Sequence, residues 1–251
     1  MGAKMNEGPR DKALAPLAQR SEVSRRELSD INSKLESATP SEVLKWANDR
    51  FGGSIVLACS FENLVLLDIA IALNPKMPVV FIDTGAHFQE TLEFVETAKE
   101  IYGLDLKVTT PGAEADHHRC GSKRCCELRK VIPLRGVLSN YRAWVTALKR
   151  VDSPTRSDIA VVSYDEVFDL VKINPLATWT DDDVDSYISD HGLMRHPLYD
   201  KGYLSIGCEP TTRPVVPGED PRSGRWSGTT KTECGIHVAS GVDQVSSQSG
   251  R

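Results

Sequence analysis

The chain of 251 residues is 40% hydrophobic and 26% charged, a composition that suits one or two globular domains with a sizeable core. The formal net charge of -5 argues against an obligate nucleic-acid binder, although a few converging cations can still bind a small anion. There is no apolar signal segment and no apolar run near the roughly 20 residues that span a bilayer, so we expect a cytoplasmic protein that does not bind membranes.

The two ends of the chain lack any periodic pattern. Residues 1–20 mix Gly, Pro, Lys and Asp, and residues 239–251 are rich in Ser, Gln and Gly, so we expect both to be mobile and without chemistry. We expect a single domain over residues 21–238. Its first part, residues 28–51, has apolar residues at helical spacing, and Thr39-Pro40-Ser41-Glu42 is typical of a helix start.

From residue 54 onward, short apolar strands alternate with helical patterns. We expect strands at residues 54–59, 79–82, 104–108, 143–148 and 167–173, and helices at residues 64–73, 90–102 and about 180–191. This alternation predicts an α/β fold, with a parallel sheet covered by helices on both faces.

Ligands of such sheets bind beyond the carboxyl ends of the strands, so the loops at these ends are candidate sites. The loop Ser60-Phe61-Glu62-Asn63 can offer backbone N–H groups and a hydroxyl to a phosphate, but it could equally be an ordinary strand-to-helix turn. The loop at residues 149–156 combines three cations with two hydroxyls. It suits a phosphate or sulfate, and the alternative is a solvated basic turn.

Six cysteines in a cytoplasmic chain favour metal or redox chemistry over structural disulfides. Cys125 and Cys126 are adjacent, a spacing that rarely forms a disulfide. Because we expect both thiols to be exposed in a charged loop, ligation is their favoured use. One alternative is a zinc-binding structural loop in an interaction protein. Its ligands would come from Cys120, Cys125, Cys126, His117 and His118.

Cys234 lies near the end of the chain in the stretch Lys231-Thr232-Glu233-Cys234-Gly235-Ile236-His237. A thiol attacks only as a thiolate, and a nearby cation such as Lys231 or a protonated His237 would lower its pKa. A free structural cysteine is the alternative, but such cysteines usually lie among apolar neighbours. We therefore interpret Cys234 as a nucleophile.

Several short motifs, taken together and in order, resemble those of one family. They are the Ser60-Phe61 loop, Asp83-Thr84-Gly85-x-His87-Phe88, Cys125-Cys126-x-x-Arg129-Lys130, the loop at residues 150–156, Asn174-Pro175-Leu176, Gly207-Cys208, Arg222-x-x-Arg225 and Glu233-Cys234-Gly235-x-His237. Over residues 50–238 the chain thus resembles the assimilatory adenylyl-sulfate and 3′-phosphoadenylyl-sulfate reductases.

The resemblance implies an adenine-nucleotide α-hydrolase-like fold and the reduction of a nucleotide-activated sulfate to sulfite. Cys234 would attack the sulfur, with His237 as a second catalytic residue. The nucleotide would leave, and the thiosulfonate on Cys234 would persist until thioredoxin or glutaredoxin releases sulfite. We expect the nucleophile to lie on a mobile tail, about residues 214–238, that closes over the substrate and later swings out.

The remaining candidate residues divide by the part of the substrate that they would contact. At the nucleotide phosphate we expect Ser60, Arg150 and Arg156, and near the adenosine Asp83, Thr84 and Gly85. At the sulfonate, positive charge should offset the repulsion between two anions, and we assign this to Lys130, Arg222, Arg225 and His237.

One position departs from the family pattern. Members that use adenylyl sulfate hold a four-iron four-sulfur cluster on a Cys-Cys pair and a distant Cys-x-x-Cys, but here Thr211 replaces the last cysteine after Cys208. Because a neutral hydroxyl is a poor ligand for cluster iron, the fourth ligand stays open between Thr211, Cys120 and an empty site. We favour adenylyl sulfate because Cys125, Cys126 and Cys208 remain. The alternative is a cluster-free reductase of 3′-phosphoadenylyl sulfate.

An ATP pyrophosphatase could share this sheet, but it would need a Gly-rich pyrophosphate loop that Ser60-Phe61-Glu62-Asn63 does not provide. The sequence leaves open whether the chain forms a homo-oligomer.

Overall fold

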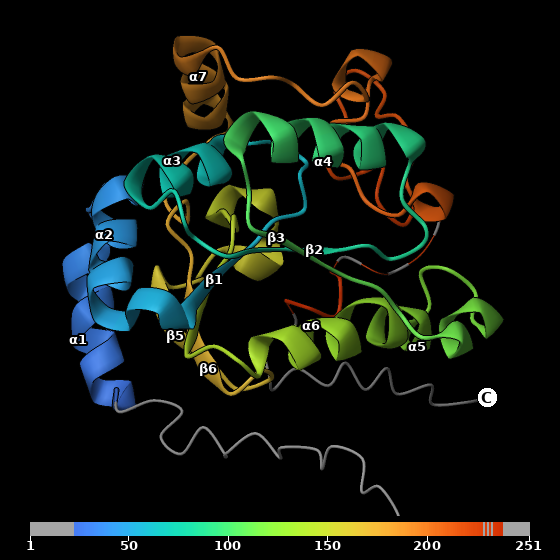
Figure 1. Cartoon of the computed structure of the whole chain (residues 1–251). Helices are drawn as coiled ribbons and strands as arrows, with labels where there is room; N and C mark the ends of the chain where they lie inside the picture. The colour runs from blue at the N-terminus through green and yellow to red at the C-terminus, as the bar shows by residue number, and fades with distance from the viewer. Residues whose placement is uncertain (1–22, 228, 230, 232, 238–251) are drawn as a thin grey trace, which may run out of the picture.

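The computed structural model describes residues 23–227, 229, 231 and 233–237, so the ends predicted to be mobile, 1–20 and 239–251, lie outside the described residues. At its centre is a six-stranded sheet with the strand order β3-β2-β1-β4-β6-β5 (Figure 1). The strands, in chain order, are β1 (Ile55–Ala58), β2 (Val79–Ile82), β3 (Leu106–Thr109), β4 (Ala143–Val145), β5 (Val162–Asp165) and β6 (Leu170–Ile173). The predicted parallel sheet is confirmed for all strands except β5, an edge strand antiparallel to β6 that the sequence did not reveal.

Helices cover both faces of the sheet, as predicted. They are α1 (Arg25–Leu35), α2 (Pro40–Phe51), α3 (Val65–Leu73), α4 (Gln89–Tyr102), α5 (Lys123–Cys126), α6 (Ile132–Leu138) and α7 (Asp181–His191). Because successive side chains of a strand point to opposite faces, β1 contributes to two cores. Ile55 and Leu57 pack in the core with α1, α2, α3, α4 and α7, whereas Val56 packs with Leu134 of α6 and Trp144. Among the described residues, no helix is both long and apolar enough to cross a membrane.

Two helices begin where the sequence predicted, and each start is a capping box. The Thr39 hydroxyl accepts a hydrogen bond from the Glu42 amide (3.3 Å), while the Glu42 carboxylate accepts one from the Thr39 amide (2.8 Å). Thr180 and Asp183 make the same reciprocal pair at the start of α7 (3.1 and 2.7 Å). Both boxes satisfy backbone N–H groups that the first helical turn leaves without partners, so these acidic residues have a structural role.

The order of the strands places the binding edge of the sheet. The chain runs outward from β1 through β2 to β3, and then crosses to β4 on the other side of β1. The connections that leave β1 and β4 therefore diverge, which opens a crevice at the carboxyl ends of these two strands.

Candidate active site

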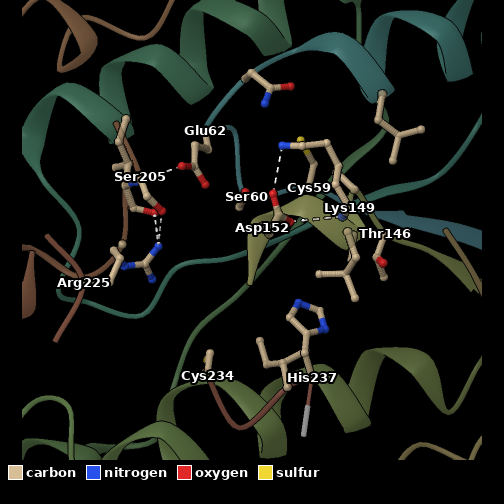
Figure 2. Close-up of a pocket in the computed structure, with 18 of the residues that line it drawn as sticks. Cys59, Ser60, Glu62, Thr146, Lys149, Asp152, Ser205, Arg225, Cys234 and His237 are labelled. Carbon is tan, nitrogen blue, oxygen red and sulfur yellow. Dashed lines mark hydrogen bonds and ion pairs between the residues drawn. The ribbon is translucent and has the colours of Figure 1, made fainter. Parts of the chain in front are cut away.

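A cavity of about 460 Å³ lies at the crevice between β1 and β4. Its walls include Cys59 and Ser60 after β1 and Thr146 after β4. The C-terminal segment contributes Cys234 and His237. Figure 2 shows these last two residues rising from one stretch of chain, across the cavity from Ser60 and Thr146. The fold thus brings the predicted nucleophile to the edge of the sheet where a ligand is expected.

Most of the residues predicted to contact a substrate line this cavity, and three do not. Those that line it are Ser60, Thr84, Lys130, Arg156, Arg222, Arg225, Cys234 and His237, and those that do not are Asp83, Gly85 and Arg150. Arg150 lies elsewhere because its guanidinium pairs with the Glu36 carboxylate (Nη2 to Oε2, 3.0 Å) and donates to the Ile159 carbonyl (3.0 Å). The structure therefore does not place Arg150 at the predicted phosphate position.

The loop of Asp83, Thr84 and Gly85 makes hydrogen bonds within itself and to Arg129, and only part of it faces the cavity. The Asp83 carboxylate accepts a hydrogen bond from the Gly85 amide (2.9 Å), and Arg129 donates to the Thr84 carbonyl (2.6 Å). The Thr84 hydroxyl is 3.7 Å from the sulfur of Cys208. Of this loop, only Thr84 is placed where a nucleotide in the cavity could contact it.

The surroundings of Cys234 favour the thiolate form of its side chain. The thiol of Cys126 donates a hydrogen bond to it and, together with the charges of Lys130 and Lys231, keeps the pKa of Cys234 well below its ordinary value, although burial opposes this. The Lys231 ammonium also donates to the sulfur of Cys126 (2.9 Å). Lys231 thus acts as the sequence predicted, while the contribution of Cys126 was not foreseen.

His237 is a neutral side chain, so the predicted protonated His237 was wrong. Burial and the nearby charges of Lys172 and Arg156 lower its pKa well below the ordinary value. The imidazole stacks on Trp144 (ring centroids 6.1 Å apart, 15° between planes), and its Nδ1 is 3.4 Å from the Lys172 ammonium. A lysine ammonium can only donate, so beside a charged Lys172 the neutral ring accepts at Nδ1 and carries its proton on Nε2.

Lys172 contacts two residues that line the cavity, His237 and Trp144, and the sequence did not reveal it. Burial lowers its pKa to about 8, and its ammonium lies 4.9 Å from the centroid of the Trp144 ring. The available signal was a single lysine inside the otherwise apolar strand Leu170–Ile173.

Glu233, next to the nucleophile, fastens the C-terminal segment to the loop after β4. Its carboxylate accepts hydrogen bonds from Arg156 (Nε 2.8 Å, Nη2 2.7 Å), from the Ser153 hydroxyl (2.8 Å) and from the Thr155 hydroxyl (3.1 Å). The Nη2 atom of Arg222 lies 3.7 Å from Oε2 of the same carboxylate. Burial alone would raise the pKa of Glu233, but the bonds from Arg156 and Ser153 hold it below its ordinary value. Arg156, which was predicted to bind a phosphate, is therefore engaged here by a carboxylate of the same chain.

Comparisons with known proteins agree with this site. Residues 54–214 match the model of the phosphoadenosine phosphosulfate reductase domain. The chain is 43% identical to the adenosine 5'-phosphosulfate reductase of Mycobacteroides abscessus, over 82% of this chain and 91% of that protein. It is 42% identical to the enzyme of the same name from Mycolicibacterium smegmatis, over 85% and 95% of the two chains. The chain belongs to the phosphoadenosine phosphosulfate reductase family. It is accordingly an oxidoreductase that acts on a sulfur group.

Solved structures confirm the fold of this family member. The phosphoadenylyl-sulfate reductase of Candida auris, solved as a phosphate complex, has a TM-score of 0.68 at 26% identity, over 77% of this chain and 99% of that one. The FMN adenylyltransferase of Candida glabrata has a TM-score of 0.57 at 18% identity, over 74% and 66% of the two chains, which shows a shared fold alone. The predicted adenine-nucleotide α-hydrolase-like fold is confirmed.

The reductase surrounds its nucleophile with cations. Burial alone would lower the pKa of Lys130, but the charges of Cys234 and Cys208 raise it above the ordinary value, so Lys130 stays charged between the two sulfurs. Arg225 donates to the Ser205 hydroxyl (3.1 Å) and the Ile206 carbonyl (3.0 Å), the first of which Figure 2 shows. Its Nε is buried and has no hydrogen-bond partner among the described residues. This side of the cavity can therefore take up negative charge.

The adjacent cysteines lie on a helix and are buried, so the predicted exposed thiols in a loop were wrong. Cys125 and Cys126 are 2% and 5% exposed at the end of α5, and the π-helical turn Glu127–Val131 continues into α6. Neighbouring residues of a helix point about 100° apart. Cys125 interacts with Cys120, whereas Cys126 interacts with Cys234. The pair thus faces two parts of the site at once.

The donor set around Cys125 fits an iron–sulfur cluster. Cys120 interacts with both Cys125 and Cys208, and Cys126 follows Cys125 on the same helix. The Nε of Arg129 is buried without an acceptor among the residues that the structure describes. Thiolates with nearby N–H donors suit such a cluster.

The residues proposed for a zinc-binding loop do not form a metal site in the part of the chain that the structure describes. Among the described residues, no three His, Cys, Asp or Glu side chains converge as the ligands of a single ion would, and this includes His117 and His118. A cluster does not need such convergence, because each of its thiolates binds a different iron.

Proposed function

We propose that this reductase converts adenylyl sulfate to sulfite and AMP in assimilatory sulfate reduction, through a thiosulfonate on Cys234. The observation that carries the proposal is the position of Cys234, which lines the cavity beside Lys130, a cation that favours its thiolate form. An activated sulfate is an anion with a good leaving group, so it needs an anionic sulfur nucleophile and cations that offset the repulsion. The names of the similar mycobacterial enzymes support the choice of substrate.

The first step transfers the sulfonate to the enzyme. The nucleotide lies at the carboxyl ends of β1 and β4, with its sulfate toward Cys234. The sulfur of Cys234 attacks the sulfur of the substrate, a bond between the two sulfurs forms, and the bond to the phosphate oxygen breaks as AMP leaves. Lys130, Arg222 and Arg225 offset the charge of the sulfonate, and the Nε2–H of neutral His237 is a hydrogen-bond donor for one of its oxygens.

The second step regenerates the thiol. A thiolate of thioredoxin or glutaredoxin attacks the sulfur of Cys234, sulfite leaves with the electron pair of the bond between the sulfurs, and the second thiol of the donor resolves the mixed disulfide. The attacking thiol must reach Cys234, so we propose that the segment carrying it moves outward at this stage. A four-iron four-sulfur cluster held by Cys125, Cys126 and Cys208, when bound, would tie α5 to the loop that precedes the tail.

The second candidate function is a cluster-free reductase of 3′-phosphoadenylyl sulfate. It is favoured by Thr211, which stands where the cluster pattern expects cysteine, and by the name of the similar enzyme from Candida auris. The three buried thiols at Cys125, Cys126 and Cys208 weigh against it, because a cluster-free enzyme has no use for them.

The experiment is a sulfite-release assay on anaerobically purified protein, with both nucleotides, thioredoxin as donor and iron quantified. We expect turnover of adenylyl sulfate at least tenfold faster, in protein that contains iron. Cys234→Ser should abolish release while AMP binding persists, because the nucleophile is lost and the phosphate contacts are not. A faster reaction with the 3′-phosphorylated nucleotide in iron-free protein would replace the proposal with the second candidate.

A further inference from the structure

Thr211 occupies the position of the missing cysteine, but its side chain does not face that site as a ligand would. Its hydroxyl donates to the carbonyl of Cys208 (3.3 Å) within the turn Glu209–Thr211. Its methyl group faces the backbone of Gly121, where an added Cβ would come within 2.9 Å of it. Thr211 therefore packs against the turn that follows Cys120.

Cys120 reaches the same place from the other side. Its backbone lies in the turn that Thr211 touches, and the Lys231 ammonium donates to the Gly121 carbonyl of that turn (2.9 Å). Gly121 has a φ of 88°, a conformation that favours glycine, and it turns the chain from Cys120 into Ser122. The Ser122 hydroxyl then accepts from the amide of Cys125 (3.1 Å) and starts α5. The sulfur of Cys120 is thus fixed relative to Cys125 by a short, defined turn.

We propose that Cys120 is the fourth thiolate ligand of the iron–sulfur cluster in this chain, in place of a cysteine at position 211. The inference rests on the proposed cluster enzyme and names a ligand that the family pattern does not provide. Cluster iron prefers thiolate to a neutral hydroxyl, and the turn that carries Cys120 packs against Thr211 and is joined by Lys231 to Cys126. The threonine at position 211 and the cysteine at position 120 then belong together. The ligand lost at position 211 is replaced by Cys120, whose turn packs against Thr211.

The charges around the four sulfurs suit four thiolates. Lys130 lies beside Cys208, Arg129 beside Cys125, and the Lys231 ammonium donates to Cys126 (2.9 Å) and to the Gly121 carbonyl (2.9 Å). Lys231 thus joins the turn after Cys120 to the adjacent cysteine pair. Cations and N–H donors beside cluster ligands stabilise the bound state, and here they surround the proposed set of four.

The test measures iron and acid-labile sulfide per chain, with the visible absorbance of the cluster, in anaerobically purified variants. They are the wild type, Cys120→Ala, Thr211→Cys, the double variant Cys120→Ala/Thr211→Cys, and Cys59→Ala as the cysteine control. Cys59 is a suitable control for iron content because it directly follows β1 and its sulfur is hydrogen-bonded to the Phe61 backbone.

We expect about four irons per chain in the wild type and in Cys59→Ala. Cys120→Ala should retain less than half of that iron and lose its absorbance in air at least fivefold faster. The double variant should recover the wild-type content, because it restores the family pattern. In the loaded wild type Cys120 should resist alkylation, and removal of iron with a chelator should expose it.

Three results would overturn the inference, and they can be distinguished. Full iron in Cys120→Ala would show that Cys120 is not a ligand while leaving the cluster enzyme intact. Iron lost from Cys120→Ala and not restored in the double variant would assign the loss to local damage. Iron-free wild-type protein that turns over the 3′-phosphorylated nucleotide would remove both the proposed function and this inference.

Discussion

Glu233→Gln should loosen the segment that carries the nucleophile without removing any group that touches the substrate. The Glu233 carboxylate accepts two hydrogen bonds from Arg156 and one each from the hydroxyls of Ser153 and Thr155. An amide keeps the size of the side chain, but it loses the charge and one acceptor oxygen. The change therefore tests whether this carboxylate positions Cys234.

The magnitude follows from the kind of bond that is lost. Hydrogen bonds to charged groups contribute about 1.5–3 kcal/mol each, and both partners are largely buried here (9% and 11% of the side chains exposed), so solvent screening is weak. If the neutral amide keeps half of the interaction, the closed state of the segment loses about 1.5–3 kcal/mol. That loss is roughly ten- to a hundredfold in the equilibrium between closed and open states.

The assay is hydrogen exchange of the peptide that contains residues 233–237, together with steady-state kinetics. Exchange should be roughly ten- to a hundredfold faster in Glu233→Gln. We expect kcat to fall, while affinity for AMP is unchanged or higher because Arg156 is released. The control is Glu219→Gln, which removes an exposed carboxylate paired with Arg213 (3.2 Å) and should change neither quantity by more than twofold. Exchange and kcat within twofold of wild type in Glu233→Gln would refute the positioning role.

Three further predictions concern the cations and the core. Arg222→Ala and Arg225→Ala should each weaken the affinity for adenylyl sulfate roughly ten- to a hundredfold more than the affinity for AMP in equilibrium titrations, because both line the cavity where we propose that the sulfonate binds. Equal losses of the two affinities would contradict this. Gly207→Ala should reproduce the Arg225→Ala affinities, because a Cβ there would overlap the guanidinium, and wild-type affinities would oppose this. His196 is buried, with Nδ1 accepting from the Leu198 amide (3.2 Å), and burial lowers its pKa to about 4. The unfolded chain thus binds more protons between about pH 6.5 and pH 4, so stability should fall as pH drops through this window, by about 3 kcal/mol in all. Denaturant unfolding of wild type and His196→Leu should show a flatter pH dependence in the variant, and parallel curves would argue against the assignment.

The parts of the fold that the sequence predicted are those fixed by local patterns. Apolar runs identified β1, β2 and the helices between them, and Thr39 and Thr180 marked helix starts because capping is decided within four residues. The sequence did not predict the edge strand β5 (Val162–Asp165), because this short strand carries polar residues and shows no apolar run. The burial of Cys125 and Cys126 escaped because their charged neighbours, which suggested a loop, lie on a helix that also has a buried side.

In the site, residue types were predictable and their partners were not. Lys231, a neighbour of Cys234 in the sequence, lowers the pKa of that thiol as predicted, whereas Cys126 and Lys130 lie about a hundred residues away in the chain. Arg150 and Arg156 looked equivalent in one basic loop, yet the fold pairs one with Glu36 and the other with Glu233. These partners are 114 and 77 residues away in the chain, so no local pattern reports them. The same holds for Cys120, whose contact with Cys208 exists only in the folded chain.

The central claim is that Cys234 forms a covalent bond to the sulfur of the substrate. It is tested by incubating wild-type protein with adenylyl sulfate without any reductant, and then mapping adducts by mass spectrometry of intact protein and peptides. We expect one added SO₃ group, on the peptide that contains Cys234, and its release as sulfite when thioredoxin is added. An adduct on Cys208 or Cys126 instead, or sulfite formation by Cys234→Ser, would contradict it.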